Sequence, residues 1–87
     1  MNIVVYDICS QKRLTKISSI CERYGVRIQK SVFECDINES DIIRLKSEIN
    51  KIIDHEKDSF IIYSIPVNIK KFKYYIGKKT NDQFVLL

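Results

Sequence analysis

The sequence predicts an α+β fold, with two helices on one sheet, and three observations lead to this prediction. Apolar residues recur at helical spacing over residues 11–24 and again between Ile42 and Ile53. β-Branched and aromatic residues fill three other segments, which are 2–8, 26–37 and 59–66. With 87 residues and no low-complexity linker, the chain has the length of one domain with a modest core. We therefore expect residues 1–87 to form a single domain.

The first half of the chain joins a strand to a helix. The apolar run Ile3–Tyr6 within a strand at about residues 2–8 suits a strand that is covered on both faces, and Asp7 marks the point where this strand reaches water. Ser10 is a suitable N-cap for a helix over residues 11–24, and Gly25 is a suitable residue to end that helix. The expected order here is strand, then helix.

The second half repeats the pattern. Residues 26–37 have strand composition throughout, and they form either two short strands that meet near Lys30 or one strand with a bulge. Asn38 opens the second helix in the manner of a capping box. The polar run 54–58 is expected to be a loop before the next strand, and residues 83–87 look like a short final strand.

This order of elements is that of a ferredoxin-like βαββαβ fold, in which two helices cover one face of a four-stranded antiparallel sheet. Both faces of the first and fourth strands carry apolar residues, as Val4 with Val5 and Ile61 with Ile62 illustrate. We expect a second copy of the chain to cover the other face, so that a two-fold homodimer packs sheet to sheet. The extra C-terminal strand, within residues 78–87, is expected to pair with the partner subunit's sheet.

Polar residues at the end of the first strand predict a ligand site. In a sheet-to-sheet dimer, one Asp7 from each chain would supply two carboxylates to a shared space, and two carboxylates are enough for Mg²⁺. Lys12 and Arg13 follow in the first turn of the helix, where the helix dipole disfavours positive charge unless an anion binds there. The alternative is an ordinary turn aspartate beside two solvated cations.

The distribution of charge favours a polyanionic partner. The formal net charge is +4, and residues 59–87 hold five lysines against one acidic residue, whereas residues 36–58 hold four basic and seven acidic residues. Lys78 and Lys79 belong to the C-terminal group, which would attract duplex phosphates without reading sequence. The alternative is a solvated face of the protein.

The cysteines indicate a reduced compartment. Cys9, Cys21 and Cys35 are an odd set without Cys-x-x-Cys spacing, and the N-terminus has no signal-like segment, so we expect a cytoplasmic protein. His55 is the one histidine, which leaves no ligand pair at zinc-finger spacing. No apolar stretch reaches the roughly 18 residues that a bilayer span requires.

Three features together resemble a known family. They are "VVYDI" at the end of the first strand, Arg13 early in the helix, and "YGVRIQKSVFECDI" at residues 24–37. In these features the chain resembles the small CRISPR-associated endonucleases, the second universal CRISPR-associated protein, which accompanies the integrase in spacer acquisition. The resemblance covers most of the chain but is loose after Pro66.

The resemblance implies a ferredoxin-like homodimer in which Asp7 is the metal-binding and catalytic residue, with Mg²⁺ as cofactor. Five further positions match the family motifs and are candidates for nucleic-acid binding or for support of the site, namely Tyr6, Arg13, Arg27, Ser31 and Phe33. Family members act on single-stranded RNA or double-stranded DNA. The implied partners are the integrase and nucleic acid.

Three functions stay open from the sequence. The first is a Mg²⁺-dependent endonuclease, which would need Asp7 for cutting. The second is a structural scaffold that holds duplex DNA between integrase subunits without cutting. The third is a ribonuclease toxin of related shape or a ligand-binding regulatory domain, because a fold alone does not determine function.

Overall fold

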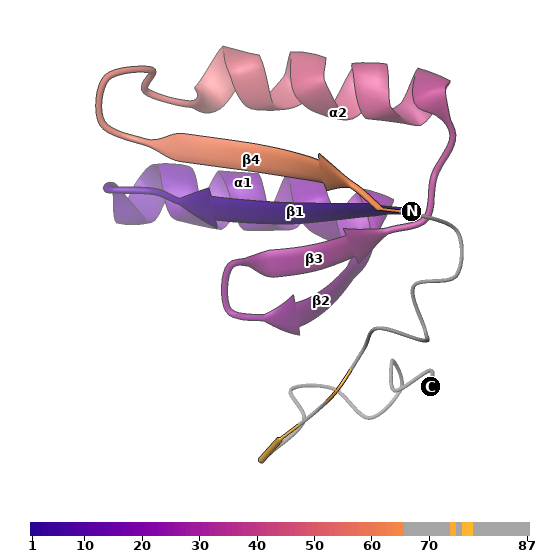
Figure 1. Cartoon of the computed structure of the whole chain (residues 1–87). Coiled ribbons are helices and arrows are strands. Elements are labelled where there is room, and N and C mark those ends of the chain that lie inside the picture. The colour runs from indigo at the N-terminus through magenta and orange to yellow at the C-terminus, as the bar shows by residue number, and fades with distance from the viewer. Residues whose placement is uncertain (66–73, 75, 78–87) are drawn as a thin grey trace.

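The computed structural model describes residues 1–65, 74, 76 and 77, and its ordered elements form one sheet with two helices (Figure 1). Along the chain these elements are β1 (Asn2–Asp7), α1 (Gln11–Tyr24), β2 (Val26–Gln29), β3 (Val32–Cys35), α2 (Glu39–Ile52) and β4 (Ser59–Ser64). The strands lie in the order β2-β3-β1-β4, and every neighbouring pair is antiparallel. The predicted ferredoxin-like fold is confirmed. The predicted C-terminal strand and Lys78 and Lys79 lie outside the described residues.

The two helices begin at the residues that the sequence predicts. The side chain of Ser10 accepts a hydrogen bond from the backbone N–H of Arg13 (3.3 Å), and that of Asn38 accepts one from Asp41 (2.9 Å). The first turn of α2 contains Glu39 and Asp41, whereas that of α1 contains no acidic residue. In the part of the chain that the structure describes, no helix has the length and apolarity needed to cross a membrane.

Gly25 ends α1 where the chain passes very close to β3. A Cβ atom at this position would lie 2.3 Å from the carbonyl oxygen of Glu34 and 2.5 Å from Sγ of Cys35. Only glycine fits without a backbone shift, because a real Cβ atom is excluded from such distances. This close contact fixes how α1 meets the sheet.

Residues 26–37 form a hairpin, which decides the alternative that the sequence left open. β2 and β3 pair directly, and a register shift between Arg27 and Gln29 adds an irregularity within β2. The turn also contacts β1, since the backbone N–H of Tyr6 donates to the carbonyl oxygen of Ser31 at 3.1 Å.

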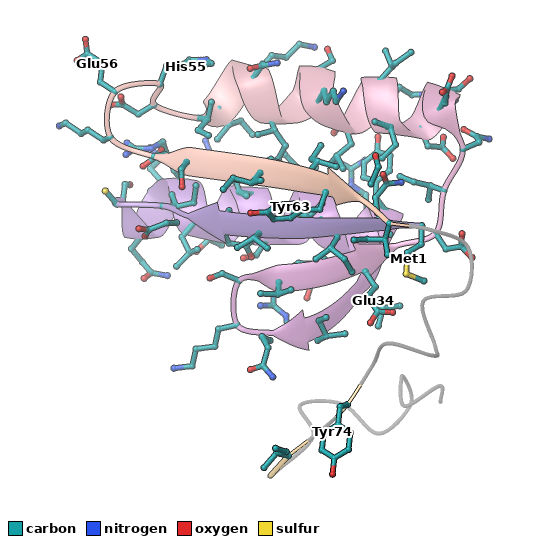
Figure 2. All side chains as sticks on the ribbon, in the orientation of Figure 1. Met1, Glu34, His55, Glu56, Tyr63 and Tyr74 are labelled. Atoms are coloured by element: carbon teal, nitrogen blue, oxygen red, sulfur yellow. The ribbon has the colours of Figure 1, made fainter. Side chains whose placement is uncertain are left out.

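The two faces of the sheet differ in cover. On the helix side, Val4 and Phe33 are fully buried with residues of α1 and α2 in one core. The opposite face, here called the open sheet face, follows the alternate residues of each strand and carries Ile3, Val5, Val32, Ile61 and Tyr63. Tyr63 lies on it, turned away from α1 (Figure 2). Ile61 is 43% exposed and Tyr63 52%, and the acidic residue Glu34 pairs with Ile3 on the same face, so this face is largely apolar and accessible.

Candidate functional site

Asp7 is the last residue of β1 and lies opposite Ser59, the first residue of β4. Strand alternation places its side chain on the open sheet face, with Ile3 and Val5, and it is exposed to solvent. Each chain therefore presents one accessible carboxylate at the edge of an apolar surface.

Tyr6 supports the end of β1 from the helix side. Its side chain is 3% exposed, and its hydroxyl lies 2.7 Å from Oγ of Ser18 in α1, within a hydrogen bond. Its ring stacks on Phe60 at 5.9 Å between centroids and on Phe33 at 6.2 Å. Because Tyr6 and Phe33 are both buried, their place in this structure is support of the strand that carries Asp7 and not direct stacking on a base.

Arg13 forms a bidentate ion pair with Asp58. Its Nε lies 2.7 Å from Oδ2 and its Nη2 lies 3.1 Å from Oδ1. The Asp58 side chain is 0% exposed and the Arg13 side chain 25%. The guanidinium of Arg13, which the sequence made a candidate for nucleic-acid binding, thus uses two of its N–H groups on a carboxylate. A phosphate would have to use the three remaining N–H groups of Arg13.

Asp58 is the residue that sequence reasoning missed, because it was assigned only to a polar loop. Its carboxylate also accepts hydrogen bonds from the backbone N–H of Cys9 (2.8 Å) and of Asp54 (2.9 Å). The hydrogen bonds from Arg13, and after them those from the two backbone N–H groups, hold the pKa of Asp58 well below its ordinary value, and the hydrogen bond to Asp58 raises the pKa of Arg13. The one signal for Asp58 in the sequence was its spacing of four residues from another aspartate, Asp54.

Arg27 lies at the β2–β3 hairpin and not at the Asp58 network. Its guanidinium lies 4.8 Å above the Phe33 ring, and its Nη1 donates to the carbonyl oxygen of Lys30 at 2.6 Å. A salt bridge to Glu22 spans 3.4 Å. Ser31 contacts the site strand through its backbone, as described above. These contacts stabilise the hairpin that supports β1.

The described residues contain no group of three or more His, Cys, Asp or Glu side chains that could hold a metal ion. The donor that does suit Mg²⁺ is the exposed carboxylate of Asp7, because this ion binds hard oxygen ligands and often takes only one or two carboxylates. A second carboxylate would have to come from another chain.

The cysteines do not offer an alternative centre. Burial is the main cause that raises the pKa of Cys21 to about 12 and that of Cys35 to about 11, so both thiols stay protonated at neutral pH. Cys9 is exposed, and its thiol donates to the carbonyl oxygen of Lys57 at 2.9 Å.

Comparison with known proteins gives consistent matches. The family described as "CRISPR associated protein Cas2" matches residues 1–72. The chain is 39% identical over 82 residues to the CRISPR-associated endonuclease Cas2 of Halalkalibacterium halodurans, covering 88% of this chain and 85% of that protein. It is 37% identical over 75 residues to the CRISPR-associated endoribonuclease Cas2 1 of Moorella thermoacetica, with coverages of 80% and 78%. The crystal structure of Streptococcus pyogenes Cas2 at pH 6.5 matches with a TM-score of 0.81 and 31% identity, over 87% of this chain and 98% of that one.

Fold and site together define a ferredoxin-like domain with an accessible carboxylate at the end of its first strand. The chain belongs to the Cas2 family of CRISPR-associated proteins. The family predicted from the motifs at Asp7, Arg13 and residues 24–37 is confirmed. Its relatives are named as endonucleases and endoribonucleases, which agrees with the prediction of a nuclease.

Proposed function

We propose that the chain acts in CRISPR spacer acquisition as a homodimer, binds duplex DNA together with the integrase, and cleaves phosphodiester bonds with Mg²⁺ held by Asp7. The observation that carries this proposal is the exposed Asp7 carboxylate on the open sheet face. A two-fold axis through an apolar face brings identical residues near each other. The proposed compartment is the cytoplasm, which suits three free cysteines.

In this proposal the two Asp7 side chains of a dimer would hold one Mg²⁺, which would supply Lewis-acid chemistry at a phosphoryl oxygen and at a bound water molecule. Arg13 contributes the N–H groups that Asp58 leaves unused, and these can donate to phosphate oxygens. Tyr6 and the carbonyl of Ser31 hold the end of β1 in place through the contacts described above. The substrate is double-stranded DNA or single-stranded RNA.

Two features support a dimer in which the C-terminal strand is exchanged. β4 is one of the two end strands of the described sheet, so its outer edge has no strand neighbour among the described residues. Beside it, a cleft of about 340 Å³ opens between α2 and β4, and its apolar lining includes Ile49, Ile53, Phe60 and Ile62. The apolar sequence "QFVLL" at residues 83–87, which lies outside the described residues, would add a strand to this edge in the partner subunit.

A second candidate function is a DNA-binding scaffold that does not cut. The engagement of the Arg13 fork by Asp58 favours it, because one of the two cations in the first turn of α1 is largely neutralised. In that case Asp7 would be dispensable for spacer acquisition. Membership of the Cas2 family leaves the ribonuclease toxin and the regulatory domain without support.

The test compares wild type, Asp7→Asn and Asp36→Asn on labelled single-stranded RNA and duplex DNA, with Mg²⁺ or with chelator. Asp36→Asn is the matched control, since Asp36 is an exposed aspartate after β3. We expect cleavage by wild type and Asp36→Asn only with Mg²⁺, and none by Asp7→Asn. Equal cleavage by all three proteins would point to a contaminant, and binding of duplex DNA without cleavage by any of them would establish the scaffold.

A further inference from the structure

A buried carboxylate, that of Asp58, joins the two chain connections at one end of the sheet. These are the β1–α1 connection and the α2–β4 loop, which lie at the same end (Figure 1). Asp58 accepts four hydrogen bonds, from the N–H groups of Cys9 and Asp54 and from Nε and Nη2 of Arg13. Its side chain is fully buried. A buried carboxylate with four donors fixes the relative positions of the segments that supply them.

Asp58 is connected to the neighbourhood of Asp7 through both β1 and β4. The bond to the N–H of Cys9 restrains the chain two residues after Asp7, where it leaves β1. Ser59, the residue after Asp58, pairs with Asp7 across the sheet. Asp58 therefore restrains the backbone on both sides of the Asp7–Ser59 pair without lying on the open sheet face itself.

The ion pair adds an electrostatic effect to this restraint. Without Asp58, the guanidinium of Arg13 would lose its bidentate partner and would be free to seek another carboxylate at this end of the sheet. Asp58 both anchors the connection and keeps Arg13 in one orientation. Loss of Asp58 changes the surroundings of Asp7 through backbone and charge together.

We propose that Asp58 is a positioning residue, which holds the β1–α1 connection in the shape that presents the Asp7 carboxylate to a divalent cation. This inference rests on the proposed metal site and extends it, because it assigns part of the cation affinity to a side chain that does not touch the cation. A purely structural Asp58 would affect the free energy of unfolding but leave the cation affinity of the folded protein unchanged.

The experiment measures binding of Mn²⁺, used as a paramagnetic probe, from the broadening of amide NMR signals of residues 6–9 in the folded protein. Asp58→Asn is compared with Asp54→Asn as matched control. Among the described residues, the hydrogen bonds that the Asp54 side chain accepts come from its own loop, from the N–H groups of Glu56 and Lys57. We expect Asp58→Asn to raise the Mn²⁺ concentration at half-saturation about tenfold or more, as for other residues that support metal ligands. Asp54→Asn should stay close to wild type.

The outcomes separate this inference from the proposed function. If wild type is broadened around Asp7 and Asp58→Asn has the same half-saturation, Asp58 is purely structural and the inference is overturned while the metal site stands. If wild type shows no broadening around Asp7, the metal site itself is wrong and the inference falls with it. If Asp58→Asn does not fold, Asp58→Glu carries the test, because its longer side chain keeps the negative charge beside Arg13 but moves the carboxylate relative to the N–H of Cys9. A folded Asp58→Glu with unchanged half-saturation would overturn the inference.

Discussion

The pair of Asp58 and Arg13 shows how one residue determines the state of another that is distant in sequence. The two residues are 45 positions apart, yet their contact decides how much of the Arg13 guanidinium a phosphate can reach. Their bond also sets the protonation of Asp58, because a carboxylate that receives four donors strongly favours its charged form. Acid stability is the property in which this effect is measurable.

The lowered pKa of Asp58 predicts a pH-dependent contribution to the free energy of unfolding. The folded state keeps Asp58 ionised below about pH 4, where the same side chain in the unfolded chain takes up a proton. The contribution is therefore complete above that pH and is lost as the pH falls through the folded pKa. Urea unfolding of wild type and Asp58→Asn should give a difference that is largest near neutral pH and shrinks in acid. A difference that stays constant with pH would contradict the prediction.

Gly25 gives a second prediction for a single residue. Gly25→Ala would place a Cβ atom against the backbone carbonyl of Glu34, which has no flexible side chain to move aside. We expect a loss of about 1–3 kcal/mol in the free energy of unfolding, typical of overpacking, measured by urea titration. Ser47→Ala on the exposed face of α2 is the control and should change it little. Equal stability of Gly25→Ala and wild type would mean that α1 can move away from β3.

Sequence patterns predicted the roles of some of these residues but not of others. Asp7 and Gly25 follow from their positions at the end of a strand and of a helix, so their local roles could be predicted. The burial of Tyr6 and Phe33 depends on which strand face meets the helices, and an apolar run on both faces does not reveal it. The role of Asp58 could not be found, because its partners Cys9 and Arg13 come from the distant β1–α1 segment, and its spacing from Asp54 does not encode a contact of that range.

At the scale of elements, the two helices differ in how their first turns treat the helix dipole. α2 begins with Glu39 and Asp41 after its Asn38 cap, which is favourable, while α1 begins with Lys12 and Arg13. Arg13 has an explanation in its bond to Asp58. Lys12 is exposed, and no described contact accounts for it. The sequence predicted both helices and both caps correctly, because these signals are local.

Lys12→Glu is predicted to separate stability from nucleic-acid binding. An acidic residue in the first turn should stabilise α1 by about 0.3–1 kcal/mol, whereas loss of an exposed cation five residues after Asp7 should weaken duplex DNA binding and reduce its salt dependence. Thermal unfolding and DNA titration at two salt concentrations measure the two effects. Lys51→Glu in the last turn of α2 makes the same charge change and should destabilise its helix instead. If both variants lose DNA affinity equally, net charge alone governs binding.

At the scale of the whole molecule, the sheet has one face buried by helices and one apolar face that the described chain leaves accessible. The order of strands and helices could be predicted because each element has its own period and the elements follow a common topology. The hairpin at residues 26–37 could not be predicted, because a bulged strand and two short strands have the same composition. A second copy that covers this face, as proposed above, would account for strands that are apolar on both sides.

Ile61→Glu on the open sheet face is predicted to break the proposed homodimer. Ile61 is 43% exposed and lies beside Val5 in the centre of the apolar surface, so a dimer would bury the new carboxylate without a partner. We expect the dissociation constant of the dimer to rise at least about tenfold, because an unpaired charge in an interface is costly. Sedimentation velocity measures this constant. Ile43→Glu is the matched control, since Ile43 is 66% exposed on α2 and should leave the dimer intact. Dissociation by Ile43→Glu and not by Ile61→Glu would move the interface from the sheet to the helices, and the two Asp7 carboxylates would then lie on separate surfaces.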